Sequence, residues 1–341
     1  MTELEFSHIK NLLIRRNEVS MKQKHILPIQ DPILKAYLHI GMPFSILPDK
    51  LIECGWVYNT YTQLVYFNED PEDSFVDFTQ ERFWEESNVF TKGFVSFPAR
   101  TQDERQQMMH EIRKLIDMGY YIYGEWDEFL IPGTPFYQRK PFRHYFLVYG
   151  YANGEIYAEG YLEDGHWHRF TVPEEIFAKS LLADRDRDKN GMIGINTYRP
   201  RSNMEARFDY DRIKVEVGKY LNCIGEKIYL PYGTEAIEAF FNDVREAMQQ
   251  LGEFPIQSVY IIYEHKIMMQ RRMEYMLANK FGACTREEVE QYKKLTEEFY
   301  TVVCNCVKYK IARKSSFGNR VYSKVVDIQR QEQELLRRVF V

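Results

Sequence analysis

Tyr120-Tyr-Ile-Tyr-Gly-Glu-Trp126 opens the part of the sequence that decides the fold, and two similar segments follow it, His144-Tyr-Phe-Leu-Val-Tyr-Gly-Tyr151 and Glu155-Ile-Tyr-Ala-Glu-Gly-Tyr161. All three are rich in aromatic and β-branched residues, which favour strands. The link Ala152-Asn-Gly154 between the last two is typical of a hairpin turn. Because the segments follow one another closely, the sequence predicts an antiparallel meander, which residues 167–172 extend.

Helical patterns surround and follow these strands. Thr101-Gln-Asp-Glu104 is a capping box that predicts the start of a helix, and Gly119 predicts its end. Trp56 to Phe67 is aromatic and β-branched and predicts one more strand. Beyond residue 200, apolar residues recur at helical spacing in segments 209–221, 235–251, 256–280, 286–312 and 321–338.

The order of these patterns predicts the fold class and the domains. Strands and helices mix in the front half, and helices alone dominate the rear half, which is typical of an α+β protein. We expect one domain over residues 1–200, built on an antiparallel sheet, and a mostly helical extension over residues 201–341 that packs on it.

The composition narrows the class of protein. The chain has 341 residues, 45% of them hydrophobic, which is enough for a sizeable core. Lys and Arg (45) are interleaved with Asp and Glu (50) and leave a net charge of −5, so no basic field is present to recruit nucleic acid. The acidic start of the chain lacks an apolar signal core, and no run has the length of a membrane span, so a cytoplasmic location is predicted. The five cysteines indicate neither a disulfide framework nor a zinc site, and no metal or other cofactor is predicted.

A further pattern links the strands to a known family. Four segments carry it: Gly119-Tyr-Tyr-Ile-Tyr123, Trp126-Asp-Glu-Phe-Leu-Ile-Pro132, His144 to Tyr151, and the strand with Glu159. Their arrangement resembles that of the butirosin biosynthesis protein H-like family, and Tyr263 to Tyr275 is similar to a helix of relatives encoded beside nonribosomal peptide synthetases. The resemblance extends over about residues 30–280. It implies a papain-like core and acyl transfer, in which a cysteine takes an acyl group from a carrier-protein thioester and passes it to an amine.

The resemblance also implies roles for particular residues. His144 is the expected base for the thiol, and Glu159 is the expected acid that holds the imidazole, at a position where relatives more often have aspartate. A histidine at the start of one strand and an acid on the next suits this arrangement. The segment Ala36 to Ser45, where the nucleophile should lie, contains no cysteine.

Cys54 is the only cysteine in the front half of the chain and is the remaining candidate nucleophile. Pro48 to Glu53 indicates a short helical turn before it, and this places Cys54 at a helix C-terminus, where a thiolate is not favoured. We therefore expect a catalytically degenerate accessory protein of bacterial peptide or polyketide assembly that binds a carrier protein, an acyl chain or a partner enzyme. An active acyltransferase or thioesterase that uses Cys54 is the alternative, and a purely structural module is a third.

Four other motifs have both a functional and a structural interpretation, and the structural one is favoured for each. Asp127-Glu128 could supply an acid and a base, but acids at this place more often bind backbone amides of a turn. Asp186-Arg-Asp-Lys-Asn-Gly-Met-Ile193 begins like a calcium loop but lacks the final glutamate. His166-Trp-His168 places two imidazoles on one strand face without an evident third ligand. Glu264-His265-Lys266, with Arg271-Arg272, is expected to be a solvated helix face, with docking of a carrier domain as the alternative.

Overall fold

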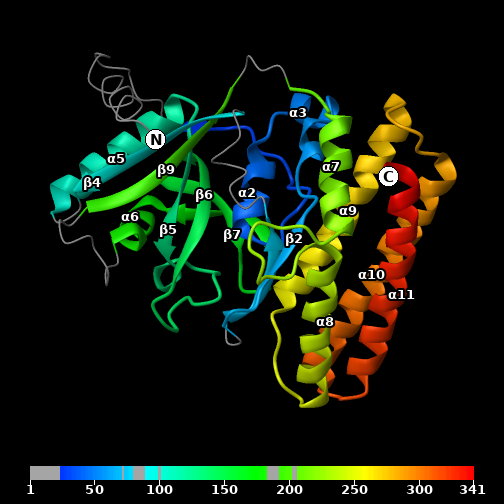
Figure 1. Cartoon of the computed structure of the whole chain (residues 1–341). Coiled ribbons are helices and arrows are strands. Elements are labelled where there is room, and N and C mark those ends of the chain that lie inside the picture. The colour runs from blue at the N-terminus through cyan, green and yellow to red at the C-terminus, as the bar shows by residue number, and fades with distance from the viewer. Residues whose placement is uncertain (1–23, 71–72, 80–88, 99–100, 183–191, 202–205) are drawn as a thin grey trace. The chain divides into compact units, whose positions relative to one another are not determined.

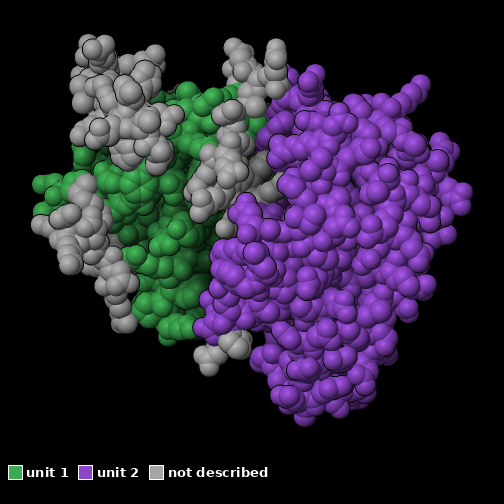
Figure 2. Space-filling view, viewed as in Figure 1, with its two compact units in different colours: residues 1–46, 84–204 green, residues 47–83, 205–341 purple. Residues whose placement is uncertain are grey.

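The computed structural model describes residues 24–70, 73–79, 89–98, 101–182, 192–201 and 206–341. It combines an antiparallel sheet with C-terminal helices, so the predicted α+β class is confirmed at this level. The contacts group the chain into two compact units, coloured separately in Figure 2: unit 1 holds residues 1–46 and 84–204, and unit 2 holds residues 47–83 and 205–341. Residues 47–83 thus group with the C-terminal helices, whereas the division into domains at residue 200 stays a prediction.

One antiparallel sheet is the centre of unit 1. Its strands are β1 (Lys24–Ile26), β4 (Phe90–Pro98), β5 (Tyr121–Asp127), β6 (Arg143–Ala152), β7 (Glu155–Tyr161), β8 (Trp167–Pro173) and β9 (Met192–Pro200). They lie in the order β4-β9-β5-β6-β7-β8, and β1 pairs with β6 (Figure 1). The predicted meander over β5, β6, β7 and β8 is confirmed. Its β6–β7 turn forms because Asn153 and Gly154 both adopt the left-handed backbone, with φ of 52° and 78°.

Three helices of the described residues pack on the sheet of unit 1. The helices are α2 (Leu38–Ile46), α5 (Gln102–Asp117) and α6 (Glu174–Leu182). The expected capping box starts α5, since Thr101 accepts from the backbone of Glu104 and Glu104 accepts in return. Gly119 follows it with φ of 83°.

Each face of the sheet has its own core. On one face, the buried indole of Trp126 stacks on Phe146 at 5.2 Å between centroids and meets Phe177 of α6 at 5.0 Å. On the other face, α2 approaches β8 so closely that a side chain at Gly41 would lie 2.8 Å from the ring of Trp167. Helices α6 and α2 therefore cover opposite faces of the sheet, and the side chains that they bury alternate along its strands.

Unit 2 is mainly helical. Its helices are α3 (Asp49–Glu53), the 3-10 turn η1 (Trp56–Asn59), α7 (Tyr210–Leu221), α8 (Gly233–Gln249), α9 (Ile256–Asn279), α10 (Arg286–Ala312) and α11 (Phe317–Phe340). The five helices predicted beyond residue 200 are confirmed within a few residues. The strands β2 (Leu64–Phe67) and β3 (Phe75–Phe78) form a small antiparallel sheet in the same unit.

The strand predicted over Trp56 to Phe67 is wrong except at its end. Residues 56–59 form a 3-10 turn, and β2 starts only at Leu64. Side chains of α9 make the hydrogen bonds to this backbone that a neighbouring strand would otherwise make. Arg272 donates to the carbonyls of Tyr58 (2.7 Å) and Thr60 (2.6 Å), and the carbonyl of Thr62 pairs with His265 Nε2 at 2.9 Å.

Among the described helices, none combines the length and the apolar character needed to cross a bilayer.

Candidate functional site

His144 forms an imidazole–carboxylate pair, but its partner is Glu128. The Nδ1 atom of His144 lies 2.6 Å from Oε1 of Glu128. Glu128 is fully buried, whereas the side chain of His144 is 33% exposed. Since Nδ1 is held by the acid, the opposite ring nitrogen Nε2 is left to interact with a ligand or with solvent. This is the orientation in which a histidine acts as a base or as a hydrogen-bonding group.

The strand register explains why Glu128 reaches His144. Trp126 lies directly across from His144, and Glu128 follows Trp126 by two residues, so its side chain is a diagonal neighbour on the same face. The backbone of Glu128 still bonds to that of Phe142, which continues the pairing beyond the strand ends. The second carboxylate oxygen of Glu128, Oε2, has no hydrogen-bond partner within the described residues.

Aromatic rings surround the imidazole. Phe142 and Phe146 meet the ring of His144 edge to face, with centroids 5.6 and 6.1 Å away. A buried acid behind the ring and apolar groups beside it limit the positions that the imidazole can take. His144 is therefore fixed in place although a third of it is open to solvent.

Glu159 lies on the opposite face of the sheet. It pairs with Leu147 of β6, and Leu147 and His144 point to opposite faces because they are three positions apart, an odd number, along the strand. Gly160, next to Glu159, is the residue that packs under Phe146 on the face of His144. The predicted pairing of His144 with Glu159 is thus wrong, and the catalytic roles assigned to both stay predictions.

The surroundings of Glu159 are those of a buried carboxyl group under α2. The indole Nε1 of Trp167 donates to Oε2 at 3.3 Å, and the side chain is fully buried. Burial raises the pKa of Glu159 from 4.5 to about 7, and the hydroxyl of Ser45 and the indole of Trp167 oppose this increase. Arg169, directly across on β8, also lowers the pKa, by a weaker interaction through space.

Cys54 lies where the sequence predicts it, at the C-terminal end of a short helix. It is the C-cap of α3, and its thiol donates to the carbonyl of Leu51 at 3.7 Å. Cys54 does not lie at the N-terminal end of this helix, where a thiolate would be stabilised. Cys54 belongs to unit 2, and so do the other four cysteines, at positions 223, 284, 304 and 306. Unit 1, which holds His144, contains no cysteine.

The remaining motifs of the front half have structural partners or lie outside the described residues. Asp127 binds the turn, as predicted, because its Oδ1 accepts from the backbone of Phe129 and Phe142 at 3.0 Å each. Asp164 accepts from the backbone of His166 at 2.9 Å and lies 2.7 Å from Nε2 of His168. The loop of residues 186–191 lies outside the described residues. Where the structure is described, no three His, Cys, Asp or Glu side chains gather in a way that could hold a metal ion.

The charged residues of α9 are mostly buried, so the predicted solvated face is wrong for them. Lys266 and Arg272 are 0% exposed, and His265 is also fully buried. Burial lowers the pKa of His265 well below its ordinary value, and the Lys266 charge adds to this, so the imidazole is neutral. In the sequence, apolar residues lie on both sides of Glu264-His265-Lys266, and this pattern does not indicate that the charged side chains face the interior.

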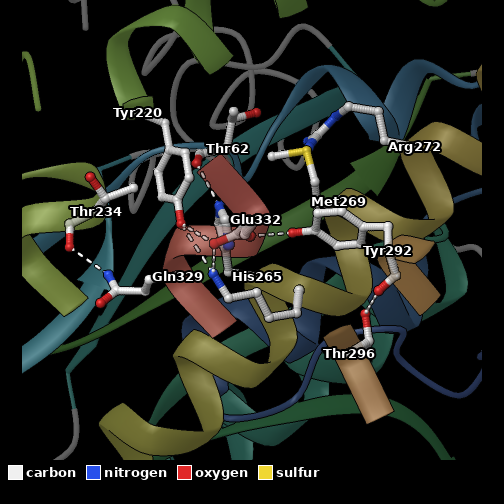
Figure 3. Close-up of polar contacts among 11 residues, drawn as sticks. Thr62, Tyr220, Thr234, His265, Met269, Arg272, Tyr292, Thr296, Gln329 and Glu332 are labelled. Atoms are coloured by element: carbon white, nitrogen blue, oxygen red, sulfur yellow. Dashed lines mark hydrogen bonds and ion pairs between the residues drawn. The ribbon is translucent and has the colours of Figure 1, made fainter. Parts of the chain in front are cut away.

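These buried groups form a network that joins four helices (Figure 3). Glu332 of α11 accepts from Lys266 of α9 at 2.5 Å, from Tyr220 of α7 at 2.9 Å and from Tyr292 of α10. Lys266 also donates to the hydroxyl of Tyr220 at 3.1 Å. Each of the four helices contributes one member, so one buried carboxylate links α7, α9, α10 and α11.

No family model matches this chain, and no curated protein matches its sequence. The resemblance to the butirosin biosynthesis protein H-like family therefore stays a prediction.

Proposed function

We propose that this chain is an accessory protein of bacterial peptide or polyketide assembly that binds an acyl-loaded carrier protein without covalent catalysis. In this proposal the sheet unit is a papain-like core that has lost its nucleophile. One observation carries the loss of catalysis. The fixed imidazole of His144 lies in a unit whose sequence contains no cysteine, and Cys54, in the other unit, ends a helix and bonds to Leu51.

The geometry of the His144–Glu128 pair suits binding as well as catalysis. Glu128 fixes the ring through Nδ1. When Nδ1 donates to the carboxylate, Nε2 of the neutral ring accepts a hydrogen bond from an amide, and Nε2 of the protonated ring donates one to an acyl carbonyl. Such a bond orients an acyl group but breaks no bond in it, since acyl transfer needs a nucleophile that attacks the carbonyl.

The test is incubation of the chain with an acyl-loaded carrier protein, followed by intact-mass measurement and by titration calorimetry. We expect a complex, no mass increase on this chain, and weaker binding for His144→Ala. His168→Ala is the matched control, because it removes another strand histidine of the same unit, whose imidazole pairs with Asp164. The proposal is overturned by an acyl adduct on Cys54 that disappears in His144→Ala, or by the absence of any complex.

A further inference from the structure

A groove of about 590 Å³ lies between α9 and α10 in unit 2. Its volume is within the range of small-molecule sites. Three tyrosines line it, at positions 58, 263 and 300, together with polar and charged side chains of both helices. None of these residues belongs to the His144 site, and one of them, Thr296, meets the buried network around Glu332, because its hydroxyl donates to the carbonyl of Tyr292 at 3.2 Å. The groove is therefore distinct from the His144 site.

The groove has an aromatic end. The rings of Tyr263 on α9 and Tyr300 on α10 lie 5.5 Å apart and tilted by 40°. The ring of Tyr300 is 52% exposed, so a flat apolar group can reach it from solvent. Glu297, one helical turn from Tyr300 on α10, is exposed beside them and has no ion-pair partner in the described residues.

The other end of the groove carries positive charge. Arg271 of α9 and Lys293 of α10 are both exposed, and neither has a carboxylate within ion-pair distance in the part of the chain that the structure describes. The nearby carboxylate of Glu274 already accepts from the side-chain amide of Gln270 at 2.8 Å. Two cations without carboxylate partners at one place suit an anionic group such as a carboxylate.

The distance between the two ends sets the size of the ligand. Arg271 follows Tyr263 by eight positions on α9, which corresponds to about 12 Å along a helix that rises about 1.5 Å per residue. An extended peptide of about three to four residues has this length. Two further lining side chains already donate within the protein, Thr296 to the carbonyl of Tyr292 and Gln270 to Glu274, so each offers its oxygen as an acceptor for a peptide N–H.

We propose that this groove binds a short peptide with free termini, about three residues long and with an aromatic first residue. Its carboxylate lies between Arg271 and Lys293, its aromatic ring packs on Tyr263 and Tyr300, and its ammonium group pairs with Glu297. The charges of peptide and groove are thus complementary, with Glu297 about one helical turn from both Tyr300 and Lys293 along α10.

The test uses Phe-Gly-Gly as the probe, with binding measured by titration calorimetry or by ligand-observed NMR on the full chain. Three modified probes each remove one feature: the C-terminal amide, the N-acetyl peptide and Gly-Gly-Gly. We expect each to bind about tenfold more weakly, which is the effect of losing one charged hydrogen bond or one ring contact.

The matched protein variants are Lys293→Gln and Lys294→Gln. Both residues are exposed on α10, and only Lys293 lines the groove. We expect Lys293→Gln to weaken Phe-Gly-Gly about tenfold and to lose the preference for the free acid over the amide, whereas Lys294→Gln leaves both unchanged. Equal effects of the two lysine changes, or equal binding of acid and amide to the unmodified chain, overturn the proposal. Because both changes lie on the surface, the thermal unfolding of each variant shows whether the fold is retained.

Discussion

Replacement of Glu159 by glutamine should make unit 1 less sensitive to pH. The carboxyl group is fully buried beneath α2, and its pKa in the folded protein is about 7, compared with an ordinary value of 4.5. Glutamine keeps the size of the side chain and removes its titration. The comparison of the two chains over pH therefore isolates the cost of ionising this one group.

The sign follows from the proton balance. Below pH 4.5 the carboxyl group is protonated in both states, so the folded state is not disfavoured by its burial. As the pH rises from 4.5 to about 7, the unfolded chain loses the proton and the folded protein keeps it, so the folded state loses stability. The increase in pKa corresponds to about 3 kcal/mol at 1.36 kcal/mol for each pH unit.

The assay is urea unfolding at pH 4.5 and pH 8, followed by the fluorescence of the four tryptophans, of which Trp84, Trp126 and Trp167 belong to unit 1. From pH 4.5 to pH 8, we expect the free energy of unfolding of Glu159→Gln to rise by about 3 kcal/mol relative to that of the unmodified chain. Glu155→Gln removes a carboxylate from a less buried place on the same strand and serves as the control. A difference between Glu159→Gln and the unmodified chain that stays constant with pH would refute the reasoning.

Three further outcomes are expected from the structure. Lys266→Met should cost about 3–5 kcal/mol in urea unfolding, because it leaves the Glu332 carboxylate buried without its cation, and the double change Lys266→Met/Glu332→Leu should recover most of this loss. Recovery of none of it would contradict the account of the pair. Arg272→Met should cost about 3 kcal/mol, since two buried backbone carbonyls lose a charged donor; a change below 1 kcal/mol would show that water replaces the guanidinium. Iodoacetamide should label Cys54 slowly at neutral pH, as followed by mass spectrometry, and fast labelling that His144→Ala abolishes would instead indicate an activated thiol.

Local patterns were sufficient to predict most of the elements. The capping box at Thr101 starts a helix where the sequence places it, and Asn153-Gly154 closes the β6–β7 hairpin. These features depend on a few neighbouring residues, so they can be recognised without knowledge of the rest of the chain.

The errors arise where distant residues decide the outcome. Trp56 to Asn59 has the composition of a strand, but α9 supplies the hydrogen-bond donors, and no local pattern indicates this. The buried charges of α9 could not be predicted because their partners are distant in the sequence: Lys266 donates to Glu332 of α11 and to Tyr220 of α7, and Arg272 donates to two carbonyls near residue 60.

The candidate site was missed for a different reason. Side chains alternate between the two faces of the sheet along β5, β6 and β7. Which carboxylate faces His144 therefore depends on the register in which these strands pair. With Trp126 placed across from His144, Glu128 becomes the diagonal neighbour.

The carbonyls held by Arg272 and His265 have a consequence for biosynthesis. Thr60 leaves the ribosome long before Arg272, which follows 212 positions later. Until then, these carbonyls can bond only to water. Because the second unit joins residues 47–83 to residues 205–341, it cannot be completed until almost the whole chain has been translated, and contacts so distant in sequence favour slow folding.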